Sequence, residues 1–134
     1  MYKYIISVLI TTFCLLSPVN AEEYAYFGFE PDIVTNYTVV KKKMGFVRLT
    51  VELMVPGDNL SVVEHHSPLL RDAIINIIGQ QAEAKVKSIK GRAEIQLLCE
   101  TQVKKLLTEE TGQPLVKKLL FTQWLYYFQL NYQS

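Results

Sequence analysis

The chain has 134 residues, of which 49% are hydrophobic and 20% are charged, and its formal net charge is +1. This composition fits one folded globular domain plus a processed segment, and it excludes a disordered chain. It also excludes a nucleic-acid-binding protein, because phosphate recognition needs Lys and Arg gathered on one face and the charges here are balanced.

The first 21 residues have the pattern of a secretory signal peptide. Lys3 gives a short positive region, residues 5–16 are mainly apolar, and Val19-Asn20-Ala21 offers a small-residue cleavage site. A short N-terminal membrane anchor is the alternative, but the apolar run falls short of the roughly 20 residues that span a bilayer. We therefore expect a signal peptide at residues 1–21 and one periplasmic domain at residues 22–134, beside the inner membrane.

Three strands are predicted in the first half of this domain. Residues 24–29 alternate aromatic and small side chains, and residues 33–40 are rich in β-branched residues and Tyr. Residues 46–55 alternate most strictly, as expected for a sheet with one face in the core, and turn residues follow at 56–59. The side chains predicted to share the buried face of this strand are Val47, Leu49, Val51, Leu53 and Val55.

Two or three helices are predicted next. Ser67-Pro68 suits the N-cap and first position of a helix that continues to Gly79. Residues 80–89 are also predicted to be helical, and Gly91 is interpreted as a break or tight turn. A longer helix is expected over residues 92–110, with an apolar stripe formed by Ile95, Leu98, Cys99, Val103, Leu106 and Leu107.

The last predicted element is a strand at residues 115–129. Its near-continuous hydrophobicity is typical of a strand covered on both faces. The order of strands, then helices, then a strand predicts an α+β or α/β fold. We expect a small mixed sheet with the helices packed on one face.

A collinear set of segments over most of the mature chain matches a known family pattern. Residues 67–75 read Ser-Pro-Leu-Leu-Arg-Asp-Ala-Ile-Ile, close to P-x-I-R-D-x-I-I, and residues 119–124 are close to V-x-F-T-x-F. An aromatic-Pro segment at residues 26–38, the alternating strand at 46–53 and the Gly of Lys90-Gly91-Arg92 also match. Together these segments resemble the FliL family of flagellar basal-body proteins.

The resemblance implies a stomatin-like (SPFH-type) domain with helices on a small curved sheet. It also implies a non-enzymatic protein that associates with the motor stator at the flagellar basal body, forms homo-oligomeric rings and supports flagellar rotation and motility. No cofactor is implied. Family members typically carry a cytoplasmic tail and a full transmembrane anchor, whereas the apolar segment here has the features of a cleavable one. This difference fits a soluble paralogue of the family.

Four residues are candidates for an interface: Arg71, Asp72, Tyr127 and Tyr132. Arg71 and Asp72 are adjacent on a helix and do not face each other, so Arg71 could pair with an acid of a neighbouring subunit. The alternative is that both are surface residues near a helix N-terminus, where Asp is favoured. Tyr127 and Tyr132 belong to an aromatic segment that supplies either core side chains or a partner-binding patch.

No residue is predicted to be catalytic or to bind a cofactor or metal. His65 and His66 are adjacent and point in different directions, which makes them a poor chelating pair and gives no triad geometry with a nearby serine. Cys99 is the remaining thiol if the first segment is removed, and on an apolar stripe it is expected to be buried and inert.

Two other interpretations stay open. Lys41-Lys42-Lys43 fits a solvated loop, with contact to an acidic partner or to lipid headgroups as the alternative. The whole chain could also be a soluble periplasmic stomatin-like scaffold unrelated to flagella, or a small-ligand-binding protein or enzyme, because a fold does not determine a function.

Overall fold

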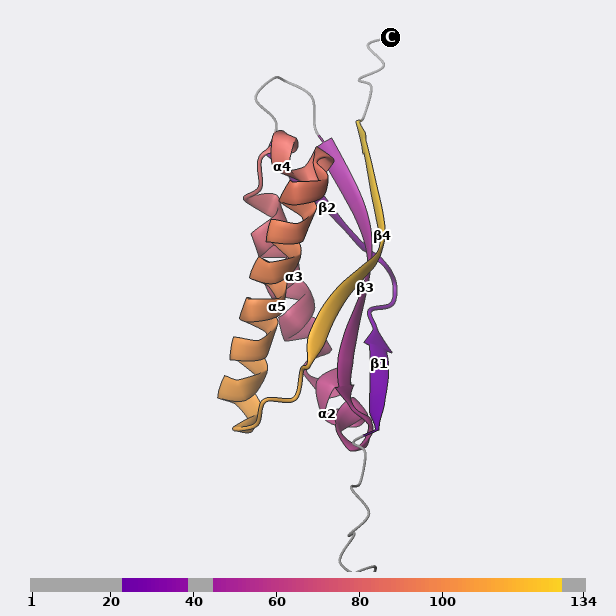
Figure 1. Ribbon diagram of the computed structural model, residues 1–134, viewed down its shortest axis with the longest axis vertical. Helices are drawn as coiled ribbons and strands as arrows, with labels where there is room; N and C mark the ends of the chain where they lie inside the picture. Colours follow the sequence, from indigo (N-terminus) through magenta and orange to yellow (C-terminus); the bar gives the residue numbers. More distant parts are fainter. Residues whose placement is uncertain (1–22, 39–44, 129–134) are drawn as a thin grey trace, which may run out of the picture.

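The structure is a computed structural model that describes residues 23–38 and 45–128 (Figure 1). The predicted signal peptide at residues 1–21, the three lysines at 41–43 and Tyr132 therefore lie outside the described residues. Within the two described ranges, no helix is both long enough and apolar enough to cross a membrane.

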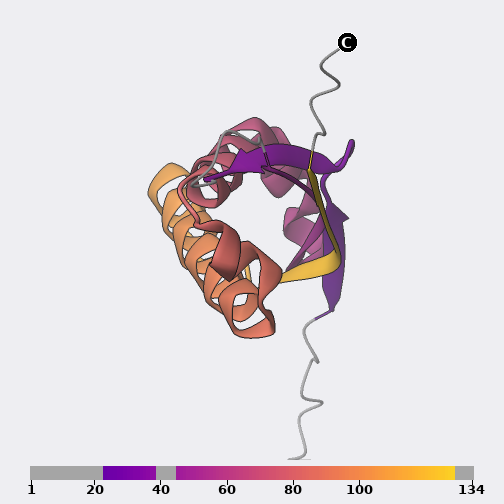
Figure 2. The same ribbon diagram turned by 90° about the horizontal axis from the view of Figure 1, so that it is seen from above.

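Strand β3 (Gly45–Pro56) is the centre of an antiparallel sheet. Its side chains alternate between the two faces of the sheet, as the period-two pattern predicted. The side chains on the inner face are fully buried, and they are Val47, Leu49, Val51, Leu53 and Val55. The pattern arises because helices cover only that face of the sheet (Figure 2).

Both edges of β3 are paired. Strands β1 (Tyr24–Gly28) and β2 (Ile33–Tyr37) pair with it one after the other, and β4 (Lys118–Phe128) pairs along nearly its whole length. Because β4 occupies one edge throughout, β1 and β2 share the other. A β-bulge interrupts the β3–β4 register between Thr50 and Val51.

The prediction of a mixed sheet is wrong for the described strands, because every pairing between named strands is antiparallel. Between residues 23–38 and 45–128, the single parallel contact is an isolated bridge between Thr38 and Ala82. Two long helices run along the sheet in opposite directions (Figure 1) and bring the chain back to the end of β3. Lys118 therefore starts β4 opposite Met54 and runs antiparallel to β3.

The helical layer consists mainly of α3 (Ser67–Gly79) and α5 (Ile89–Thr111), with the short α4 (Glu83–Lys87) between them (Figure 2). A 3-10 turn, η2 (Gly57–Asn59), and α2 (Leu60–His65) lead into α3. The described residues thus contain four α-helices, one more than the largest number predicted. The turn residues at 56–59 begin a helical segment that the sequence pattern did not indicate.

Several predicted helix boundaries are corrected by the structure. Ser67 is the first helical residue of α3, and the N-cap position falls on His66, which makes no side-chain capping bond. The predicted helix at residues 80–89 is reduced to the five residues of α4, because Ser88 is extended and is the N-cap of α5. Helix α5 ends at Thr111, one residue beyond the predicted end, where Gly112 has a φ of 74° and forms a left-handed C-cap.

Helix α5 buries one residue in every four: Gly91, Ile95, Cys99, Val103 and Leu107. The predicted apolar stripe is wrong at Leu98, whose side chain is 48% exposed. It is confirmed at the buried positions that are spaced four residues apart, which are Ile95, Cys99, Val103 and Leu107. The row of buried residues on α5 is narrow because the helix contacts the sheet along one side only.

The interpretation of Gly91 as a break or tight turn is wrong, because this residue lies in the first turn of α5. Its amide donates a hydrogen bond to Ser88 Oγ at 2.9 Å, which caps the helix. A Cβ atom at this position would overlap the backbone of Lys85 in α4. The glycine therefore allows the close approach of α4 to α5.

Cys99 is fully buried, which confirms the burial expected from its place on the apolar stripe. Burial raises the pKa of this thiol to about 12, so the reactive thiolate is scarce at neutral pH. We expect a maleimide to leave the folded domain unlabelled at Cys99 at pH 8 and to label it fully in concentrated urea, as measured by mass spectrometry. Rapid labelling of this residue in the folded protein would contradict the structure.

Two side chains of α5 hold the start of β4. Gln96 Nε2 donates to the Leu119 carbonyl at 2.8 Å, and the Leu119 amide donates to Glu100 Oε2 at 3.1 Å. The other oxygen of Glu100 accepts from Lys104 Nζ at 2.8 Å. Both backbone groups of Leu119 are thereby satisfied by the helix, which closes this part of an otherwise open sheet edge.

These contacts make the stability of the domain depend on pH through Glu100. Burial raises the pKa of this carboxyl, but hydrogen bonds from Lys104 and the Leu119 amide, with the charges of Lys104 and Lys118, hold it below its ordinary value of 4.5. A lowered pKa means that the ionised group stabilises the fold above its unfolded-state pKa. This stabilisation is lost as the pH falls through the folded-state value.

We expect Glu100→Gln to lower the free energy of unfolding at pH 7 by about 1 kcal/mol. The difference from the parent protein should shrink as the pH falls below 4.5, because the parent carboxyl then becomes protonated. Urea unfolding at a series of pH values measures this, with Glu109→Gln as the control at an exposed position of the same helix. A difference that does not vary with pH would show that the charge of Glu100 has no role.

Candidate interaction surfaces

The face of the sheet opposite the helices carries a group of large apolar side chains. We call this group the open-face patch, and it consists of Val34, Phe46, Leu125 and Tyr127. Val34 and Leu125 lie on either side of Arg48 in the register, and Phe46 lies opposite Tyr127. Val34, Leu125 and Tyr127 are 49%, 48% and 47% exposed. The patch thus spans β2, β3 and β4 on the uncovered side.

The side chains of the open-face patch are held in place by their neighbours. The rings of Phe46 and Tyr127 stack with their centroids 5.9 Å apart. Arg48 Nε donates to Asp32 Oδ2 at 3.1 Å, and Thr50 Oγ1 donates to Asp32 Oδ1 at 3.0 Å. Arg and aromatic residues are enriched at the centres of protein–protein interfaces, and this face offers Arg48, Phe46 and Tyr127 together.

The prediction that the last strand is covered on both faces is wrong. Trp124 faces the helices and its Nε1 donates to the Val86 carbonyl at 3.0 Å, whereas Leu125 and Tyr127 point to the open side. The even-numbered positions of β3 already indicated an outer face. The register that brings Val34 and Leu125 beside it could not be obtained from one sequence, because it depends on strand pairing and on the bulge.

The structure separates the predicted interface residues. Tyr127 belongs to the open-face patch, and Arg71 and Asp72 lie on α3 in the helical layer. Arg71 Nη2 donates to the Pro31 carbonyl at 2.6 Å, and its guanidinium lies 5.7 Å from the centre of the Phe29 ring. Arg71 therefore holds the β1–β2 connection against α3. Asp72 is exposed and accepts a hydrogen bond from Asn76 Nδ2 at 3.3 Å.

His65 is the last residue of α2, and His66 lies between α2 and α3. Their rings pack edge to face with the centroids 5.1 Å apart. Among the described residues, no three or more His, Cys, Asp or Glu side chains come together in a way that could hold a metal ion.

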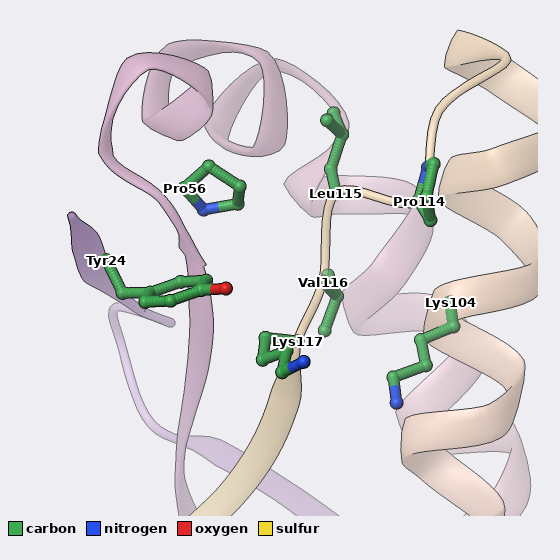
Figure 3. Close-up of a pocket in the computed structure, with 7 residues that line it drawn as sticks. All are labelled: Tyr24, Pro56, Lys104, Pro114, Leu115, Val116 and Lys117. Atoms are coloured by element: carbon green, nitrogen blue, oxygen red, sulfur yellow. The ribbon is translucent and has the colours of Figure 1, made fainter. Parts of the chain in front are cut away.

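A separate pocket of about 490 Å³ lies where β1 begins and the chain enters β4 (Figure 3). Tyr24 forms one side, and Lys104 reaches into it from α5. Lys117 approaches from the segment before β4. The remaining lining residues are apolar: Pro56, Pro114, Leu115 and Val116.

These features define an α+β domain with helices on one face of an antiparallel sheet and exposed apolar side chains on the other. The family model described as flagellar basal body-associated protein FliL matches residues 26–126, so the chain belongs to the FliL family. Its members are accessory proteins associated with the flagellar basal body. The family resemblance suggested by the sequence motifs is thereby confirmed. No curated protein matches the chain.

Proposed function

We propose that this protein is a non-enzymatic accessory protein of the flagellar basal body that associates with the motor stator and supports flagellar rotation. Membership of the FliL family supports the place of action. The open-face patch supports the mode of action, because it offers three exposed apolar side chains around a fixed Arg. Covering the remaining exposed half of an apolar side chain of this size stabilises a complex by about 1 kcal/mol before the costs of association.

We also propose that the fold is stomatin-like and that copies of the chain assemble into a ring around the stator. The antiparallel sheet with helices on one face supports this likeness. Asp72, exposed on α3, and Tyr127 of the open-face patch lie on different surfaces of the domain, and a ring joins two different surfaces of each subunit. Arg71 would contribute to the ring interface indirectly, by holding the β1–β2 connection against α3. Tyr132 remains a proposed interface residue.

The proposed location is the periplasm, beside the inner membrane, with residues 1–21 acting as a cleaved signal peptide. N-terminal sequencing of the protein recovered from the cell envelope tests the cleavage. A first residue of Glu22 supports a signal peptide, whereas an intact N-terminus would mean a short membrane anchor.

Deleting the gene in its host and measuring motility tests the proposed role. We expect slower swimming of the deletion strain in viscous medium than in thin medium, relative to the parent, because a stator accessory protein matters most under load. Expression of the chain from a plasmid should restore the parental speed. A deletion strain that swims normally in both media would contradict the role and favour a scaffold unrelated to flagella.

A further inference from the structure

We propose that the pocket between β1, α5 and the start of β4 binds the phosphate group of a small phosphate ester. This goes beyond the proposed function, which concerns protein partners. The site combines two lysines from separate elements with an aromatic wall and a mainly apolar floor (Figure 3). None of the residues that line it is acidic.

The charges of the pocket favour an anion. Lys104 Nζ donates one hydrogen bond, to Glu100, and an ammonium group has three donors, so two remain for a ligand. The side chain of Lys117 makes no ion pair with any residue in the described part of the chain. Lysine ammonium groups bind phosphate as point charges, and two of them that line one pocket suit a group with several acceptor oxygens.

The carboxylate of Glu100 forms an ion pair with Lys104 at 2.8 Å, so it offsets much of the charge of that lysine. The other oxygen of Glu100 accepts from the Leu119 amide, and its side chain is only 18% exposed. Glu100 is not among the lining residues. Glu100 therefore holds Lys104 in position, and the net positive charge of the pocket comes mainly from Lys117.

The shape of the pocket indicates an ester instead of a bare ion. Its volume of about 490 Å³ lies within the roughly 300–1,000 Å³ range of small-molecule sites. Leu115 and Val116 are nearly buried, and the Lys117 amide donates to the Met54 carbonyl at 2.8 Å, so the floor is already formed. The phosphate would lie between the lysines, with its organic group against Pro56 and Val116. A lipid headgroup and a free organic phosphate share this chemistry.

Nuclear magnetic resonance titration of the purified chain with glycerol 3-phosphate tests the proposal. We expect saturable shifts of the Tyr24 and Val116 amides, no shifts with glycerol, and at least tenfold weaker binding in Lys117→Gln. Lys90→Gln is the matched control, because it removes the same charge from an exposed lysine about 21 Å along α5 from Lys104. Thermal unfolding of each variant establishes that it is folded.

Vesicles distinguish the two sources of phosphate. If the ligand is a lipid headgroup, the chain should sediment with phosphatidylglycerol vesicles but not with phosphatidylcholine vesicles, and Lys117→Gln should abolish sedimentation. If the ligand is a free organic phosphate, glycerol 3-phosphate should bind while sedimentation does not depend on Lys117. Absence of shifts at Tyr24 and Val116, or an equal loss of binding in Lys90→Gln, would overturn the proposal.

Discussion

Replacing Gly91 by alanine is expected to lower the free energy of unfolding by about 3 kcal/mol. In an ordinary helix the same change is stabilising by up to about 1 kcal/mol, because alanine is the better helix former. Here the new Cβ would overlap the backbone of Lys85, and a backbone cannot move aside as the end of a flexible side chain can. The contact between α4 and α5 would have to open, and with it the packing of the buried Val86.

Urea unfolding followed by circular dichroism measures this loss. Gly79→Ala is the matched control, because it lies in α3 and its added Cβ would find its nearest neighbour, the Asn36 carbonyl oxygen, at 3.9 Å. That variant should be as stable as the parent or more stable. If Gly91→Ala and Gly79→Ala behaved alike, the close approach of α4 to α5 would not exist in solution.

Replacing Leu125 by arginine is expected to have the largest effect on function while leaving the fold intact. Leu125 is 48% exposed on the uncovered face, so a long charged side chain can be accommodated there. In a complex it would lose apolar contact and put a second positive charge beside Arg48. Loss of a central interface side chain costs about 2 kcal/mol or more, which is roughly a thirtyfold weaker complex.

Swimming speed of the deletion strain complemented with each variant measures this effect. Leu97→Arg is the control, because Leu97 is 65% exposed on α5 and the substitution is the same. We expect Leu97→Arg to restore swimming and Leu125→Arg to fail, at equal protein levels on an immunoblot. Equal rescue by the two variants would mean that the open-face patch does not bind a partner needed for motility.

The features predicted best from the sequence are those that depend on local periodicity. The buried face of β3 follows from strict alternation, and Ile95, Cys99, Val103 and Leu107 follow from helical spacing. The α+β class follows from the order of these elements. The family motifs depend on order along the chain in the same way, and the match over residues 26–126 confirms them.

The features that were missed depend on contacts between distant segments. A glycine such as Gly91 usually indicates that a helix is interrupted, and only the position of Lys85 explains why this one lies within α5. Arg71 looks like a surface charge until the Pro31 carbonyl is placed 2.6 Å from its guanidinium. The open-face patch needs the pairing of three strands, which no local pattern contains.

We infer that the protein works by contact of its open sheet face with another protein of the basal body. Site-specific photocrosslinking in living, swimming cells can detect this contact, with the photoreactive residue at position 125 or, for comparison, at position 97. We expect position 125 to yield a covalent adduct with a stator protein and position 97 to yield none. Adducts with a stator protein from position 97 alone, or none from position 125, would contradict it.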